Sequence, residues 1–175
     1  MSSFKFRGID LKQYGVVMES MERALIPGKR DTWIAIPNRN GKVNASNQVT
    51  YDDAMITVQC GYVRKTRDQL YSDAREIAYL FSEEGELEFS YEPDKKYKAR
   101  LISAVPLVRD LLIGRITLSF VCFPFALSSP KTVIIHNGQN QIDYSGTAET
   151  PCIIVLRNPN SYAVSNIQIT AVHRR

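Results

Sequence analysis

Side chains that could support catalysis are few and widely spaced in this 175-residue sequence. Its two histidines, His136 and His173, neighbour neither a cysteine nor a Gly-x-Ser-x-Gly turn, so no nucleophile–base pair of a hydrolase is indicated. The cysteines, Cys60, Cys122 and Cys152, are too far apart for a metal-binding motif, and each lies in the apolar or strand-like context of a buried free thiol. We therefore expect no catalytic, cofactor-binding or metal-binding residue.

Two acidic pairs and one basic cluster are the remaining concentrations of charge. Asp52-Asp53 and Glu83-Glu84 lack the glycine and the ligand spacing of a calcium loop, so they indicate solvated turns and helix ends. Residues 95–100 contain three lysines and an arginine, with Tyr91 and Tyr97 close by. This pattern fits a nucleic-acid strip, but its short length favours a solvated hairpin tip.

The composition excludes several classes of protein. The net charge of +4 is small and is divided evenly on either side of residue 128, so neither part is a strongly basic nucleic-acid binder. No apolar run approaches the length of about 20 residues that a membrane helix needs. The first ten residues lack the apolar core of a signal peptide, so we expect a protein made and used from the cytoplasm without secretion.

The clearest run of secondary-structure signals begins with a helix over residues 66–84. Thr66 and Gln69 have the spacing of a capping box, and Gly85 stands where a left-handed residue would end the helix. Apolar residues recur at steps of three and four and define the face expected to be buried: Leu70, Ala74, Ile77 and Phe81. The helix runs directly into an alternating strand over residues 86–91.

Alternating and apolar segments predict strands along the rest of the chain. The expected strands are 4–7, 16–19, 32–36, 54–63, 86–91, 98–101, 116–122, 132–136, 152–156 and 167–172. Tight turns are expected at residues 37–41 and at Pro93-Asp94. The single helix must cover an antiparallel sheet, which predicts an α+β, mostly β fold, a β-sandwich with one packed helix. We expect domains at 1–128 and 129–175, the second being the start of an incomplete sandwich.

Four stretches, in this order, carry a resemblance to a known family. They are FKFRGIDLKQYGVVMES, RDTWIAIPNRNG, GELEFSYEPDKKYKARL and FVCFPFAL. Together they resemble the distal tail protein (Dit) family of long-tailed bacteriophages (siphophages) and prophages. Asn38 stands where the family commonly has glycine, and asparagine tolerates a positive φ better than other residues with a side chain. HNGQNQIDYSGTAETPCIIVLRNPN resembles the opening of the family's second, galectin-like β-sandwich domain.

The resemblance implies a structural role in the virion. Six copies would form a ring at the tail tip, assembled in the host bacterial cytoplasm, around a channel that DNA crosses as transient cargo. The implied partners are the tail tube protein, the tape-measure protein, the tail-associated lysin or hub protein and a receptor-binding protein, with no membrane and no cofactor. A channel lining should avoid dense positive charge, so residues 95–100 should face away from it or be offset by acids such as Glu92 and Asp94.

A ring of sandwiches would use edge strands and protruding segments for its contacts. The polar arm over residues 29–49 is expected to be the segment that contacts the neighbouring copy. Its candidate interface residues are Arg30, Trp33, Asn38, Arg39, Asn40, Gly41 and Lys42.

Two other functional classes stay open. A carbohydrate-binding module would use the aromatic and polar residues of the C-terminal part: His136, Tyr144, Tyr162 and several asparagines. A basic nucleic-acid-binding protein would use residues 95–100, in a chain whose isoelectric point is about 9.0.

Overall fold

A computed structural model describes residues 3–63, 66–103, 113–148 and 150–170 of the chain. The chain separates into two compact units, Met1–Ile134 and Ile135–Arg175. All strands and helices assigned within the described residues belong to the first unit. No helix within those ranges has the length and apolar composition to cross a lipid bilayer.

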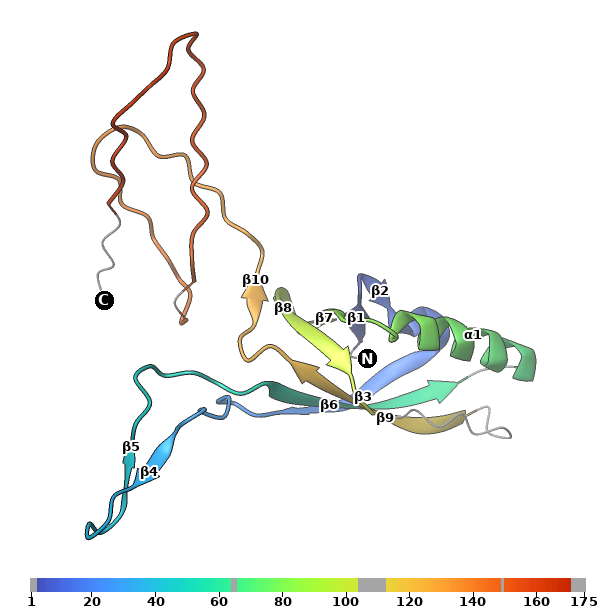
Figure 1. The fold of residues 1–175 in the computed structure, drawn as a ribbon. Coiled ribbons are helices and arrows are strands. Elements are labelled where there is room, and N and C mark those ends of the chain that lie inside the picture. The colour runs from blue at the N-terminus through green and yellow to red at the C-terminus, as the bar shows by residue number, and fades with distance from the viewer. Residues whose placement is uncertain (1–2, 64–65, 104–112, 149, 171–175) are drawn as a thin grey trace. The chain divides into compact units, whose positions relative to one another are not determined.

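The first unit is built on an eight-stranded antiparallel sheet (Figure 1). Its strands follow the order β2-β1-β7-β8-β9-β6-β3, and β10 pairs with β8 outside this path. The strands are β1 (Phe4–Phe6), β2 (Ile9–Asp10), β3 (Val16–Arg23), β6 (Ala54–Val63), β7 (Gly85–Phe89), β8 (Glu92–Leu101), β9 (Ile113–Cys122) and β10 (Leu127–Ser128). A short 3-10 helix, η1 (Leu11–Tyr14), and one α-helix, α1 (Arg67–Leu80), complete it. A second sheet holds only β4 (Trp33–Ala35) and β5 (Lys42–Asn44).

The sheet curls so that its two halves share one core. β8 pairs with β7 along most of its length and with β9 only at Ala99–Leu101, which leaves the halves free to fold over each other. Phe6 from one half and Phe120 from the other have ring centroids 5.8 Å apart, and Phe81 at the end of α1 contacts both. The predicted mostly β fold with one packed helix is confirmed.

Helix α1 begins and packs largely as its sequence predicts. The Thr66 hydroxyl accepts a hydrogen bond from the Gln69 amide at 3.3 Å, as in a capping box. Leu70 and Phe81 are buried, whereas Ala74 and Ile77 are only half-buried. The helix ends at Leu80, which is also buried, and Phe81 forms the C-cap.

Two local predictions near this helix are wrong. Gly85 does not end the helix in a left-handed conformation; it is the first residue of β7, because the chain already leaves the helix at Phe81. Pro93 and Asp94 do not turn the chain, since both lie within β8. The turn falls at Ser90-Tyr91 instead, and a register shift between Glu88 and Phe89 accommodates it.

The C-terminal part of the chain, from residue 129 on, differs from its prediction. No strand is assigned at residues 132–136, 152–156 or 167–170, and residues 171–172 of the last expected strand lie outside the described ranges, as does His173. Alternating apolar residues form a strand only where a neighbouring strand supplies hydrogen-bond partners. The apolar side chains stay exposed, with Ile153 at 93% and Val155 at 83%. Cys152, predicted to be buried, is also exposed, unlike Cys60 and Cys122.

Candidate assembly interface

Residues 24–53 form an arm between β3 and β6. The pairing of β3 with β6 ends at Arg23 and Ile56, and the chain then leaves the main sheet (Figure 1). Within the arm, β4 and β5 pair antiparallel, with Ile34 opposite Val43. The expected strand at 32–36 is therefore present, but it belongs to a separate two-stranded sheet.

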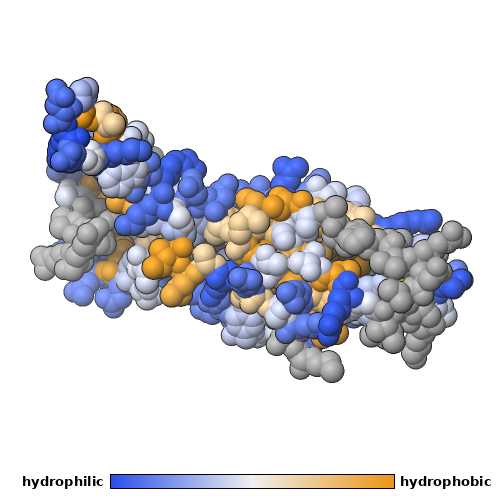
Figure 2. Space-filling view, turned by 90° about the horizontal axis from the view of Figure 1, so that it is seen from below, coloured by the Kyte–Doolittle hydropathy of each residue, from blue (hydrophilic) through white to orange (hydrophobic). Residues whose placement is uncertain are grey.

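Apolar side chains of the arm are exposed. Trp33 and Ile34 on β4 are 55% and 50% exposed, and Leu25 near the root of the arm is 94% exposed. A two-stranded hairpin is marginally stable by itself in water, and exposed apolar side chains add no stability to it. Figure 2 shows that apolar side chains reach the molecular surface in several patches among polar ones. The arm therefore presents apolar surface suited to a partner.

The tip of the arm has the turn that its sequence predicts. Asn38 and Gly41 both have positive φ angles, 61° and 79°, and the Arg39 amide donates to the Ile36 carbonyl at 3.2 Å. A Cβ at Gly41 would meet no atom within 4 Å, so the φ angle alone accounts for glycine there. The turn places Arg39 and Asn40 at the tip and Lys42 at the start of β5.

Arg30 is engaged inside the arm. Its Nε donates to Asp52 Oδ1 at 2.9 Å, and its amide donates to the Thr50 carbonyl, also at 2.9 Å. The hydrogen bond with Asp52, followed by the charge of that carboxylate, raises the pKa of Arg30. Arg30 thus holds the base of the arm together, while Arg39 and Lys42 have no ion pair within the described part of the chain.

The structure places the seven predicted interface residues on one hairpin but not on one patch. Arg30 lies at the base, Trp33 on β4, and Asn38, Arg39, Asn40, Gly41 and Lys42 at or next to the tip. Sequence reasoning missed the neighbouring apolar residues Leu25, Ile26, Ile34 and Ile36, all exposed. Their signal was present, because apolar residues in a segment without a partner inside the domain must face solvent or another molecule.

Aromatic side chains connect the returning end of the arm to the main sheet. Tyr51 lies edge-on to Phe125, with centroids 5.2 Å apart, and Phe125 in turn contacts Phe123 at 5.9 Å. Phe123 directly follows β9. This ring contact holds the arm near its root. Among the described residues, no other aromatic contact joins the arm to the main sheet.

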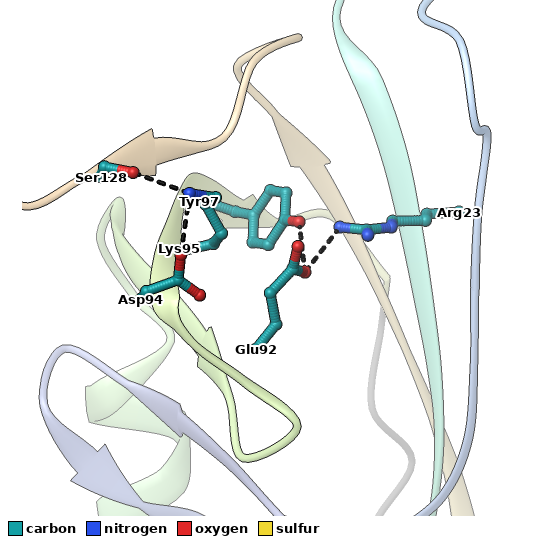
Figure 3. A network of polar contacts seen from close by, with 6 residues as sticks. All are labelled: Arg23, Glu92, Asp94, Lys95, Tyr97 and Ser128. Atoms are coloured by element: carbon teal, nitrogen blue, oxygen red, sulfur yellow. Dashed lines mark hydrogen bonds and ion pairs between the residues drawn. The ribbon is translucent and has the colours of Figure 1, made fainter. Parts of the chain in front are cut away.

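The three lysines of the basic cluster at residues 95–100 contact acids. Lys95 contacts Asp94 at 2.9 Å and donates to the Ser128 hydroxyl on β10, also at 2.9 Å (Figure 3). The Lys96 ammonium lies 2.6 Å from the Glu86 carboxylate, whose hydrogen bond raises the pKa of Lys96. Its other acidic partner is Glu88, at 3.3 Å, and Lys98 lies 2.8 Å from Glu84.

Of the two acids expected to offset this cluster, one does so. Asp94 contacts Lys95, and that hydrogen bond lowers the pKa of Asp94. Glu92 contacts Arg23 at 3.2 Å and accepts a hydrogen bond from the Tyr97 hydroxyl at 2.8 Å. Cross-strand pairing of β7 with β8 supplies Glu86 and Glu88, and Glu84 directly precedes β7, a placement that sequence spacing alone does not indicate.

The residues considered for carbohydrate binding make local contacts only. The Tyr144 hydroxyl donates to the Ala148 carbonyl at 2.5 Å, and the His136 amide donates to Asn140 Oδ1 at 3.1 Å. Tyr162 is exposed. No contact among the described residues joins these three into a site.

Comparisons with known proteins identify a family and a similar solved structure. Residues 9–122 match the model of a family described as phage tail protein RIFT-related domain, which is more than half of the chain. No curated protein matches the sequence. Among solved structures, the chain is similar to the Dit (gp 19.1) protein of SPP1, described as a paradigm of the hub adsorption apparatus in phages that infect Gram-positive bacteria. The two share 17% sequence identity at a TM-score of 0.61, over 73% of this chain and 52% of that one. This likeness concerns the fold, and the chain matches about half the length of that structure.

Proposed function

The chain belongs to the RIFT-related family of phage tail proteins, and we propose that it acts as a distal tail protein at the tip of the tail. The fold it shares with the SPP1 Dit protein supports this position in the tail. The role is structural: the chain joins the tail tube to the adhesion hub and needs no catalytic group.

The observation that carries the proposal is the exposed arm. Among the described residues its apolar side chains stay between 44% and 94% exposed at Leu25, Ile26, Trp33, Ile34 and Ile36, although a hairpin of this kind gains stability from a partner surface. If the arm of one copy contacts a different surface on the next, the contact is head-to-tail, and such contacts form a ring when the rotation between successive copies closes. We propose a ring of six copies, with Trp33, Asn38, Arg39, Asn40, Gly41 and Lys42 at the contact and Arg30 holding the arm's base.

The partners follow from the proposed position. The ring would contact the tail tube protein and the tape-measure protein on one side, and the tail-associated lysin or hub protein and a receptor-binding protein on the other. DNA would pass through the ring as transient cargo. The compensated lysines of β8 support such passage, because each unpaired phosphate contact would retain DNA.

Electron microscopy of virions tests the proposed position. Gold-labelled antibodies against this chain should bind at the tail tip of intact particles, distal to the tube. Labelling along the whole tube would instead identify a tube subunit, and labelling of the capsid would overturn the proposal.

A second experiment tests the arm as the contact. The double variant Trp33→Ser, Ile34→Ser should lose ring formation in native mass spectrometry while keeping the melting temperature, since both side chains are exposed in the monomer. The matched control is Met55→Ser, Tyr79→Ser, which removes two exposed apolar side chains outside the arm. Equal loss of rings in both variants would contradict an arm-specific contact.

A further inference from the structure

Side chains join β3 and β8 although these strands are not neighbours. β9 and β6 lie between them in the sheet order. Arg23 is the last residue of β3 before the arm, and Glu92 is the first residue of β8. Arg23 Nη1 lies 3.2 Å from Glu92 Oε2. The ion pair therefore crosses the curled sheet at the residue from which the arm departs.

Tyr97 connects this ion pair to the core. Its hydroxyl donates to the same Glu92 oxygen at 2.8 Å (Figure 3). The Arg23 guanidinium lies over the Tyr97 ring, with Cζ 5.1 Å from the ring centroid. Tyr97 is buried and packs edge-on against Phe89, at 5.9 Å between centroids. We name Arg23, Glu92 and Tyr97 the Arg23 cluster.

The geometry of the Arg23 cluster restricts the arginine side chain more than an ordinary surface ion pair would. The side chains of Arg23 and Glu92 are only 33% and 27% exposed, so solvent screens their attraction incompletely. The guanidinium has two contacts at once, the Glu92 carboxylate through Nη1 and the Tyr97 ring, over which its Cζ lies. Two contacts in different directions leave the end of β3 little freedom to rotate.

We propose that the Arg23 cluster sets the direction in which the arm leaves the sheet. Arg23 and Glu92 are positioning residues, because they act on the arm through the backbone of β3 and have no need to touch another copy. The consequence for assembly rests on the proposed ring: an arm already held in one direction loses less conformational freedom on contact. The statement about direction does not depend on the ring.

A distance measurement between spin labels tests the direction of the arm. Labels would be attached at Asn40→Cys in the arm tip and Ser72→Cys in α1, in the 175-residue chain carrying Cys152→Ser. Cys60 and Cys122 are buried and should stay unlabelled. With Arg23 and Glu92 unchanged, pulsed electron–electron double resonance should give one narrow distribution of the distance between the two labels. Glu92→Gln should broaden it by about twofold, because the uncharged amide no longer fixes the guanidinium.

Matched variants separate this effect from general destabilisation. Glu19→Gln removes an ion pair with Arg115, at 3.1 Å, from the same strand β3 but away from the arm, and it should leave the distribution narrow. Arg23→Met should broaden it as Glu92→Gln does, and Arg23→Lys should give an intermediate width because it keeps the charge without the planar contact. All four variants should keep the melting temperature of the unmodified chain within a few degrees.

The outcomes distinguish the inference from the proposed function. A distribution as narrow in Glu92→Gln and Arg23→Met as in the unmodified chain would show that the inference is wrong, whether or not rings form. Equal broadening by the Glu19→Gln control would also contradict it. A distance distribution that broadens only in the Arg23 and Glu92 variants supports the inference. If the unmodified chain then forms no ring, the proposed function alone fails.

Discussion

Three phenylalanine rings hold the helix to both halves of the sheet. Phe81 lies 5.0 Å from Phe6 and 5.7 Å from Phe120, measured between ring centroids, and is only 7% exposed. Truncating Phe81 to alanine should lower the free energy of unfolding by about 3–5 kcal/mol, because it removes buried area and leaves a cavity. Urea denaturation measures this change.

A neighbouring residue provides the control for Phe81→Ala. Tyr79 is 77% exposed at the end of the same helix, and its truncation should change the free energy of unfolding by less than about 0.5 kcal/mol. Similar losses for Phe81→Ala and Tyr79→Ala would mean that the end of α1 is not part of the core.

The cysteines differ in burial, and their reactivity should differ accordingly. Desolvation, with a smaller contribution from Glu19, raises the pKa of Cys60 from 9.0 to about 12, and burial raises that of Cys122 to about 12 as well. At pH 8 an aromatic disulfide reagent should therefore titrate one thiol in the folded chain, Cys152, and three in denaturant. Rapid reaction of all three thiols without denaturant would contradict this burial.

The same pKa values predict a stability change with pH. Below pH 9 the two buried thiols are protonated in both folded and unfolded chains, so their full contribution to stability is present. Between pH 9 and about 12 the unfolded thiols release protons while the folded ones retain them, so the free energy of unfolding must fall as pH rises. Replacing both cysteines by alanine should flatten this part of the pH profile.

Sequence periodicity identifies core residues where they lie on one face of a single helix or strand. Leu70 and Phe81 are buried as predicted from the helical spacing. The contact of Arg23 with Glu92 depends on how the whole sheet curls, and no local pattern marks either residue for it. Long-range side-chain contacts of this kind need the tertiary structure.

At the scale of single elements, α1 depends on its first turn. The Thr66 hydroxyl accepts from the Gln69 amide, one of the amide groups that a helix start leaves without a partner. Thr66→Ala should cost about 1 kcal/mol in free energy of unfolding. Ser72→Ala, an exposed mid-helix control, should be neutral or slightly stabilising because alanine favours helices. A neutral Thr66→Ala in urea denaturation would show that the cap adds no stability.

Strand prediction succeeded where alternation and partners coincide. β6 was predicted with the bounds it has, Ala54–Val63, because its alternation is unbroken and it pairs with β3 on one side and β9 on the other. The extension of β3 to Arg23 was missed, since residues 20–23 are mostly polar. Their strand conformation comes from pairing with β6, which composition does not encode.

At the scale of the whole molecule, we expect residues 1–134 to fold without residues 135–175. All assigned strands and helices of the described chain precede that point, and the buried hydrophobic residues among them form one core. A chain truncated after Ile134 should keep the melting temperature of the full chain within a few degrees in calorimetry. A loss of cooperative unfolding on truncation would show that residues 135–175 contribute to this core.

The second unit is where sequence reasoning was least successful. Its apolar segments were interpreted as strands of a sandwich, but side chains such as Ile153 and Val155 remain exposed in the described residues. A segment forms a strand only when a second strand supplies its hydrogen-bond partners. The apolar pattern of one segment does not establish that such a partner strand exists. The extent of a second sandwich domain therefore stays a prediction.

The mass of the purified chain, read together with Trp33 fluorescence, tests ring formation through the arm most directly. Trp33 is the only tryptophan and is exposed in one copy, so its emission reports burial of the arm. With rising concentration we predict a mass six times the 19.8 kDa of one chain, with a blue shift of Trp33 emission over the same range. A mass that stays at 19.8 kDa, or a ring that forms while Trp33 emission is unchanged, would contradict the proposed assembly.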